Sequence, residues 1–156
     1  MLTAILHTHN DALRIGRAIE TLRPCDEVLV MDHASEDGTF EVAQQYGARV
    51  LRAAAQAADT NPFAQARHDW ILCLLPTESL AEMVEAALFE WKEADPLPET
   101  TYSIPILQEL PGGRWSKLDP TTRLIHRPHP AGRDGLPLHD VASHVLAGYL
   151  LRLLLP

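Results

Sequence analysis

The sequence predicts an α/β domain with a Rossmann-like, mostly parallel sheet and helices on both faces. Two observations favour this class. Short apolar runs at 2–8, 28–31 and 70–75 alternate with segments in which apolar residues recur every three or four positions, so strands and amphipathic helices are expected in turn. The run at 70–75 is apolar throughout, which is typical of a central strand buried on both faces. Such alternation gives right-handed crossovers and therefore a parallel sheet between layers of helices.

The first part of the chain is expected to supply the first strands and helices of this sheet. Asn10 is positioned to cap the first helix. Gly47 ends the second helix because glycine readily adopts the left-handed conformation. The expected order is strand 2–8, a helix that ends at Pro24, strand 28–31, helix 40–46 and strand 48–51.

The rest of the chain is expected to complete the sheet, after a small-residue loop or short helix at 53–58. Pro105 cannot donate a hydrogen bond to a neighbouring strand, so its strand is expected at a sheet edge. In order, the expected elements are helical turns at 61–67, strand 70–75, a helix capped by Thr77 or Ser79, strands 102–107 and 122–126, a loop at 127–137 and a last helix at 140–155.

Length and composition limit the function classes. A chain of 156 residues is expected to form one domain, and an apolar content of 46% argues against disorder. The net charge of −8 argues against a surface that binds nucleic acid. Two cysteines fit a reducing compartment, and we find neither a signal peptide nor a run long enough to span a membrane, so a cytoplasmic protein is expected.

The C-terminal segment is unusually apolar for a surface element. Residues 145–155 are almost wholly apolar, with Gly148 and Arg152 as interruptions. A helix in this segment cannot bury all of its leucines against one sheet. We therefore expect part of it to form a homodimer contact or to rest on a membrane surface.

Two strand ends carry polar residues suited to a ligand. Asp32 follows the apolar run at 28–31, and the turn Asp37-Gly38-Thr39, interpreted as mainly structural, leads into the next helix. The first strand ends in a polar segment at 7–11. Open α/β sheets bind ligands beyond the carboxyl ends of their strands, which favours a binding role for Asp32.

The segments 2–11, 26–39 and 69–78 together resemble the start of family 2 glycosyltransferases of the GT-A fold. The resemblance is strongest over 2–51 and weakest after 102, and His7 and His9 depart from the family pattern. It implies that Thr8, Asn10, Asp11 and Asp32 surround the nucleotide of a sugar donor, most plausibly a UDP-sugar. A carboxylate can accept a hydrogen bond from a base N–H or a ribose hydroxyl, which agrees with this role. The alternative is that Asn10 and Asp11 only cap a helix.

The metal-binding motif of this family is altered in the chain. The family carries Asp-x-Asp where an alignment without gaps places Leu75 and Thr77, and Glu78 falls on the acid that follows. In the family this motif binds a divalent cation that neutralises the donor diphosphate. Mg²⁺ and Mn²⁺ prefer hard oxygen ligands, and only Glu78 offers a carboxylate here. We therefore expect no metal site, with Glu78 as the one candidate ligand.

The later part of the chain supplies candidates for catalysis. The segment 122–125 resembles an acceptor-side segment of the family, and Leu138-His139-Asp140 resembles its His-Glu. The resemblance makes Asp140 the candidate catalytic base and His139 a candidate contact to the diphosphate or to a metal. Arg123 is a further candidate because a guanidinium can replace part of the missing metal charge. Asp140 could instead cap the last helix.

Three functions stay open from the sequence. The first is transfer of a sugar from a nucleotide-sugar to a glycan or lipid-linked acceptor by a single domain, 1–156, whose acceptor-side portion at about 102–156 is reduced. The second is a catalytically degenerate module that binds a nucleotide, a glycan or a protein. The third is a small metal-dependent hydrolase, because His7 and His9 at alternate strand positions could share a metal.

Overall fold

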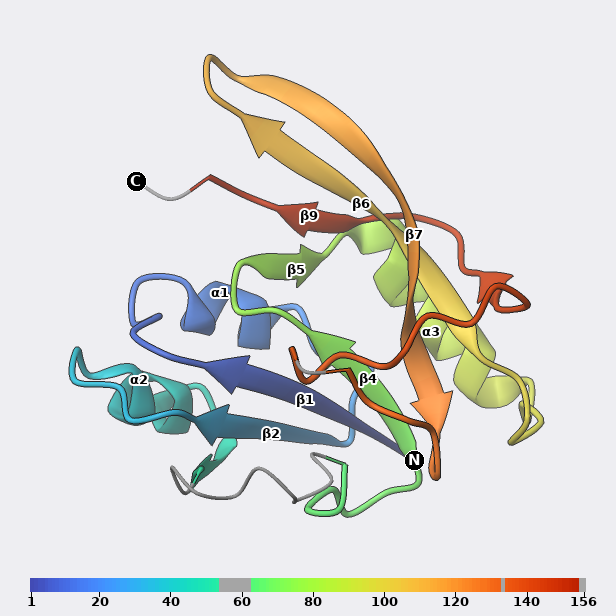
Figure 1. Cartoon of the computed structure of the whole chain (residues 1–156), viewed down its shortest axis with the longest axis horizontal. Coiled ribbons are helices and arrows are strands. Elements are labelled where there is room, and N and C mark those ends of the chain that lie inside the picture. The colour runs from blue at the N-terminus through green and yellow to red at the C-terminus, as the bar shows by residue number, and fades with distance from the viewer. Residues whose placement is uncertain (54–62, 133, 155–156) are drawn as a thin grey trace.

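The computed structural model describes residues 1–53, 63–132 and 134–154, which form a mixed sheet with three helices (Figure 1). The first strand has the bounds expected from the sequence, and the other early elements differ by a few residues at their ends. The elements are β1 (Leu2–Thr8), α1 (Ile15–Glu20), β2 (Glu27–Asp32), α2 (Thr39–Gln45), β3 (Arg49–Arg52), β4 (Trp70–Leu74), β5 (Glu78–Leu80), α3 (Glu82–Glu93), β6 (Tyr102–Leu110), β7 (Arg114–His126), β8 (His144–Val145) and β9 (Leu150–Arg152).

The strand order confirms the α/β class and shows where the parallel part ends. The sheet runs β3-β2-β1-β4-β7-β6-β9-β5, and β8 pairs with β6. The strands from β3 to β4 are parallel, whereas β7 lies antiparallel between β4 and β6. The carboxyl ends of β1, β2 and β4 therefore meet at one edge, which is the edge where α/β sheets bind ligands.

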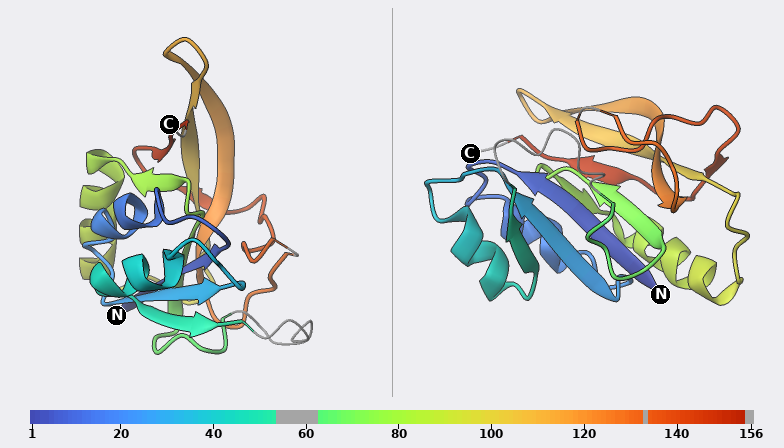
Figure 2. Two further views of the ribbon diagram at one scale, coloured as in Figure 1. Left: turned by 90° about the vertical axis from the view of Figure 1, so that its left-hand side faces the viewer. Right: turned by 60° about the horizontal axis from the view of Figure 1, so that its bottom comes forward.

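The two faces of the sheet are covered differently, which corrects the expectation of helices on both faces. Figure 2 shows α1, α2 and α3 on one side of the sheet and the loop that follows β7 on the other. On the second face, a smaller cluster includes Phe63, Ile71 and Ile125, and the partly buried Ala131 and Leu136 pack against it. The loop that contains Leu136 thus takes the place of a helix layer.

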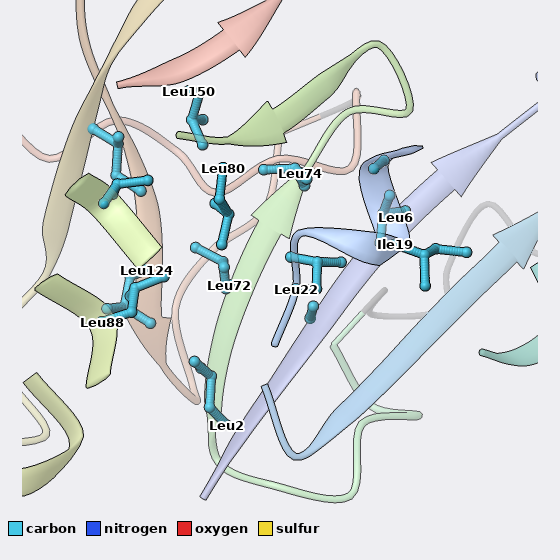
Figure 3. Close-up of a cluster of buried hydrophobic side chains, with 14 of the residues drawn as sticks. Leu2, Leu6, Ile19, Leu22, Leu72, Leu74, Leu80, Leu88, Leu124 and Leu150 are labelled. Carbon is cyan, nitrogen blue, oxygen red and sulfur yellow. The ribbon is translucent and has the colours of Figure 1, made fainter. Parts of the chain in front are cut away.

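The larger core lies between the helices and the sheet (Figure 3). Strand residues such as Leu72 and Leu124 meet Ile19 of α1 and Leu88 of α3 in this cluster. All four side chains are at most 6% exposed, so the apolar periodicity that predicted these elements does correspond to their buried faces.

Two helix starts differ from the expectation. Asn10 does not cap α1: it has a positive φ of 54°, its amide oxygen accepts from Glu36 N–H, and the helix begins at Ile15. Neither Thr77 nor Ser79 caps α3, because residues 78–80 form β5 and pair with β9. The pairing partner of β5 lies more than sixty residues away in the sequence, so no local pattern predicts this strand.

The expected last helix at 140–155 is wrong. The described part of this segment contains the two short strands β8 and β9 instead. Leu150 is fully buried where β9 runs between β5 and β6, so sheet pairing accounts for part of the apolar character of the segment. The contact with a second copy or a membrane surface through 145–155 stays a prediction, although the helix that was expected to make it is not formed. Residues 155 and 156 lie outside the described residues.

The edge position expected for Pro105 is also wrong. β6 has β7 on one side and β9 on the other, and the register between β6 and β7 shifts between Ile104 and Ile106. An irregularity in the ladder accommodates the missing N–H of Pro105 inside the sheet. Of the helical turns expected at 61–67, residues 63–65 form a turn, whereas 61, 62 and the segment 54–58 lie outside the described residues. Among the described helices, none is long and apolar enough to cross a membrane.

Candidate nucleotide and diphosphate site

The four residues expected to bind a nucleotide meet at the carboxyl ends of β1 and β2. Thr8 and Asp32 are register partners at the ends of these parallel strands. The Thr8 hydroxyl donates to Asp11 Oδ2 over 2.7 Å, and Arg14 Nε lies 3.1 Å from Asp11 Oδ1. Asp11 is therefore held between a neutral donor and a cation.

Asp32 has a more internal position than the sequence suggested. Its side chain is fully buried, and its carboxylate accepts hydrogen bonds from the Ser35 hydroxyl and from Ser35 N–H. Ser35 Oγ in turn accepts from Asn10 N–H over 2.9 Å. Asp32 thus fixes the two loops against each other, and a ligand would have to displace Ser35 to reach its carboxylate.

The turn Asp37-Gly38-Thr39 has the structural role expected for it. Asp37 accepts from the Thr39 hydroxyl and, over 3.1 Å, from Ala12 N–H. Thr39 Oγ1 accepts from Asp11 N–H over 2.8 Å. Gly38 has a φ of 88°, in the left-handed region that glycine adopts without strain. These bonds tie the start of α2 to the loop that contains Asp11.

The histidines at the end of β1 do not form the shared metal pair of the hydrolase hypothesis. His7 Nδ1 lies 2.9 Å from His33 Nε2, whereas His9 Nδ1 lies 2.6 Å from the backbone oxygen of His33. Among the described residues no group of three or more His, Cys, Asp or Glu side chains could hold a metal ion. Nothing in this part of the chain therefore supports the hydrolase hypothesis.

We expect His7 to stay neutral well below neutral pH. Burial and then the neighbouring His33 lower its pKa from 6.5 to about 4, against an opposing effect of Asp134. Because the unfolded chain would bind this proton more readily, the contribution of His7 to stability is present above pH 6.5 and is lost as the pH falls through about 4. An NMR titration of the ring signals tests this, and a pKa near 6.5 would contradict it.

The residue that follows the altered metal motif lies in a buried ionic network. Glu78 is 1% exposed and accepts from Arg123 Nη1 over 2.7 Å and Nη2 over 2.9 Å. The same carboxylate accepts from Arg152 Nη2 over 2.8 Å and from Leu75 N–H over 3.0 Å. Burial alone would raise the pKa of Glu78, but Arg123, the backbone N–H and Arg152 together hold it below its ordinary value.

A divalent cation does not fit these residues. Leu75 offers no ligand atom, Thr77 offers only a hydroxyl, and both oxygens of Glu78 already accept from guanidinium groups. A cation beside Glu78 would also be repelled by Arg123 and Arg152. Glu78, the one ligand that the sequence suggested for a cation at the donor diphosphate, is thus a partner of two arginines.

A cavity of about 690 Å³ opens beside this network, between β7 and the loop before β8. Leu75, Arg123 and Arg152 line one part of it. Asp134 and His139, from the loop, line another. Arg123 itself is 1% exposed, and both of its Nη groups donate to Glu78, so its charge is already compensated.

The candidate base Asp140 lies next to the cavity and not in its lining. Asp140 Oδ2 accepts from the Thr101 hydroxyl over 2.7 Å, and Oδ1 accepts from Ala142 N–H over 2.9 Å. These bonds, the Thr101 bond first, lower the pKa of Asp140. His139 does line the cavity, with Nδ1 3.1 Å from Thr122 Oγ1.

Sequence reasoning missed three charged residues of this region. Asp119 and Asp134 line the cavity, and Arg152 borders it from β9. The aspartates lie in segments where the resemblance to known proteins is weak. Arg152 was seen only as an interruption of an apolar run, although a lone cation in such a run is itself a signal for a buried partner.

Comparison with known proteins supports the fold and a relationship in sequence. No family model matches the chain. It is 34% identical over 88 residues to an "Uncharacterized glycosyltransferase" of Rickettsia felis, which covers 54% of this chain and 31% of that protein. A protein of the same description from Rickettsia bellii is 33% identical over 88 residues, with 54% and 30% covered. The chain spans about a third of the length of these relatives.

Solved glycosyltransferase structures share the architecture. One is a mannosyltransferase from Pyrobaculum calidifontis in complex with GDP-Man and Mn²⁺, with a TM-score of 0.57, 15% identity and 93% of this chain and 55% of that chain covered. Another is glucosyl-3-phosphoglycerate synthase from Mycobacterium tuberculosis with Mn²⁺, UDP and glucosyl-3-phosphoglycerate, with a TM-score of 0.52, 17% identity and 73% and 45% covered. The chain therefore has a GT-A-like fold and resembles glycosyltransferases.

Proposed function

We propose that this chain forms the donor-binding part of a glycosyltransferase that uses a nucleotide-sugar. The observation on which the proposal rests is the convergence of Thr8, Asp11 and Asp32 at the carboxyl ends of two adjacent parallel strands. This is the ligand-binding edge of an α/β sheet, and it occurs here in a GT-A-like fold.

The nucleotide would lie against the two interlocked loops. Asp11 and the exposed Asn10 are accessible there, whereas Asp32 would act after Ser35 moves or by holding Ser35 in place. A UDP-sugar is the donor that we propose first, because the residues that resemble family 2 glycosyltransferases include the carboxyl ends of β1 and β2.

The sugar and the acceptor would occupy the cavity beside Leu75. Its volume of about 690 Å³ is in the range of pockets that hold small molecules. The carboxylates of Asp119 and Asp134 suit the hydroxyl groups of a glycan, because ionised carboxylates accept hydrogen bonds and donate none. Asp140 would be the base if the acceptor hydroxyl approaches past His139.

Loss of a nucleotide-loop carboxylate is expected to weaken nucleotide binding. Asp32→Ala should lower the affinity for UDP by roughly 1.5–3 kcal/mol, because the site loses either a charged hydrogen bond to the nucleotide or the loop position that this carboxylate fixes through Ser35. Isothermal titration calorimetry with UDP and GDP measures this, with circular dichroism as the check on folding. Glu20→Gln, an exposed acid in α1, removes the same charge elsewhere and should bind like wild type. Equal affinities for wild type and folded Asp32→Ala would refute the assignment.

A second candidate function is nucleotide or glycan binding without turnover. The position of Asp140 favours it, since both oxygens of this carboxylate already accept hydrogen bonds outside the cavity lining. Release of nucleotide from UDP-glucose, UDP-N-acetylglucosamine and GDP-mannose, with and without a glycan acceptor, separates the two. Turnover that Asp140→Asn abolishes while nucleotide affinity stays unchanged supports the transferase. Nucleotide binding with no turnover of any donor supports the binding module.

A further inference from the structure

We propose that Arg152, oriented by Glu78, binds the diphosphate group of the donor and takes the place of a divalent cation. This inference rests on the proposed function. It adds to the site a residue of β9, which lies outside the nucleotide loops. Its starting point is that Leu75, Thr77 and Glu78 do not fit a divalent cation.

The ionic network leaves one uncompensated positive charge. Arg123 and Arg152 share the single carboxylate of Glu78. Arg123 is buried and donates to Glu78 and, through Nε, to Thr121. It is therefore fully engaged, so the excess charge belongs to Arg152.

Arg152 also has an unpaired donor, and its side chain is partly exposed. Its Nε is buried and has no hydrogen-bond partner among the described residues, although a buried N–H is normally satisfied. Its side chain is 28% exposed, against 1% for Arg123. Glu78 and Gln108 Oε1 hold the Nη groups, at 2.8 and 3.3 Å, so the guanidinium is oriented before a ligand arrives.

Arg152 lines two hollows, and one of them is connected to the nucleotide loops through Arg14. The smaller, of about 210 Å³, is lined by Arg14, Thr77 and Arg152. Arg14 is the residue that contacts Asp11 of the nucleotide loop. The larger hollow is the cavity beside Leu75. A donor with its nucleotide at Asp11 and its sugar in the cavity would place its diphosphate beside Arg152 and Arg14.

The charges around the two hollows fit a diphosphate in the smaller one and a sugar in the larger one. Glu109 also lines the smaller hollow, where its Oε2 accepts from Leu154 N–H over 3.1 Å, and among the described residues no ion pair joins it to Arg14 or Arg152. The other acids, Asp119 and Asp134, lie in the larger cavity, where hydroxyl groups would be bound. Arginine suits a diphosphate because its planar donors can contact two phosphate oxygens at once.

The test compares ligands with and without the diphosphate. Affinities for uridine, UDP, GDP and inorganic pyrophosphate are measured by calorimetry in excess EDTA and again with Mn²⁺, for wild type, Arg152→Gln and Arg152→Lys. Arg114→Gln, an exposed arginine at the tip of the β6–β7 hairpin, is the matched control. Thermal unfolding shows whether each variant is folded, and Arg152→Lys retains a cation if Arg152→Gln does not fold.

We expect wild type to bind UDP at least tenfold more tightly than uridine in EDTA, with less than a tenfold change on adding Mn²⁺. Arg152→Gln should lose this preference while its affinity for uridine stays the same, Arg152→Lys should keep part of it, and Arg114→Gln should keep all of it. Pyrophosphate should compete with UDP and not with uridine.

Two outcomes overturn the inference, in different ways. A preference for UDP that appears only with Mn²⁺, or that survives in Arg152→Gln or is undiminished in Arg152→Lys, refutes the role of Arg152 and leaves the nucleotide site standing. Failure of wild type to bind uridine, UDP and GDP refutes the proposed function together with the inference.

Discussion

Replacement of Glu78 by glutamine is expected to destabilise the fold by about 3–5 kcal/mol, because it leaves buried arginine charge without its counter-ion. Glu78 is the shared acceptor of Arg123 and Arg152 and has no exposed side-chain surface. The glutamine keeps the shape, so the loss would report the charge and not a cavity. Urea denaturation followed by circular dichroism measures the free energy of unfolding.

The double variant Glu78→Leu with Arg123→Met is the control for this interpretation. Removal of both members of a buried pair is often neutral or stabilising, and Arg152, which also loses its partner, is partly exposed to water. The double variant should therefore recover most of the stability lost in Glu78→Gln. If Glu78→Gln lowers the free energy of unfolding by less than about 1 kcal/mol, the ion pair lies in a much more polar environment than its burial indicates.

The same network gives stability a dependence on pH. Since the pKa of Glu78 is lower in the folded protein than in the unfolded chain, the unfolded chain binds the proton more readily. Its contribution is present above the ordinary pKa of a glutamate and is lost as the pH falls through the lowered value. Glu78→Gln should therefore flatten the acid side of the stability profile.

The parallel half of the fold could be predicted from the sequence because its signals are local. The continuous apolar run of β4 and the helical spacing of α3 each lie within one stretch of chain. In the C-terminal half, the strands expected at 102–107 and 122–126 do lie within β6 and β7. β5 and β9 could not be predicted, because among the described strands β5 pairs only with β9, and β9 pairs with β5 and β6. An apolar run at 145–155 has no period that separates a buried strand from a helix.

The residues of the candidate site also divide into those with a local sequence signal and those with a distant partner. Thr8 and Asp32 could be found because they end strands, and Asp11 because it closely follows the first of these strands. The structure brings the three residues together as expected. Arg152 could not be found, because its partner Glu78 is more than seventy residues away in sequence. The resemblance directed attention to Asp140, whereas the described cavity is lined by Asp119 and Asp134.

Replacement of Gly148 by alanine is expected to be among the most destabilising single-atom additions in the chain. Gly148 has a φ of 98°, and an added Cβ would lie 2.5 Å from the backbone nitrogen of Val84 in α3. The next residue, Tyr149, accepts from Ala81 N–H over 3.1 Å, so the segment before β9 is fixed against the start of this helix. Backbone cannot yield as a flexible side chain would, and about 3 kcal/mol or more of stability should be lost through strain and displacement.

Gly47→Ala separates the two causes, because Gly47 has a φ of 88° but no atom within 4 Å of the added Cβ. It should lose only the cost of the left-handed conformation, about 1–2 kcal/mol. The difference between the two variants in urea denaturation therefore measures the contact of residue 148 with α3. Because Gly148 lies four residues before Arg152, a displaced β9 should also reduce the preference for UDP over uridine, while Gly47→Ala leaves it unchanged. Equal losses of stability in the two variants would show that the strand before Arg152 is not held by α3.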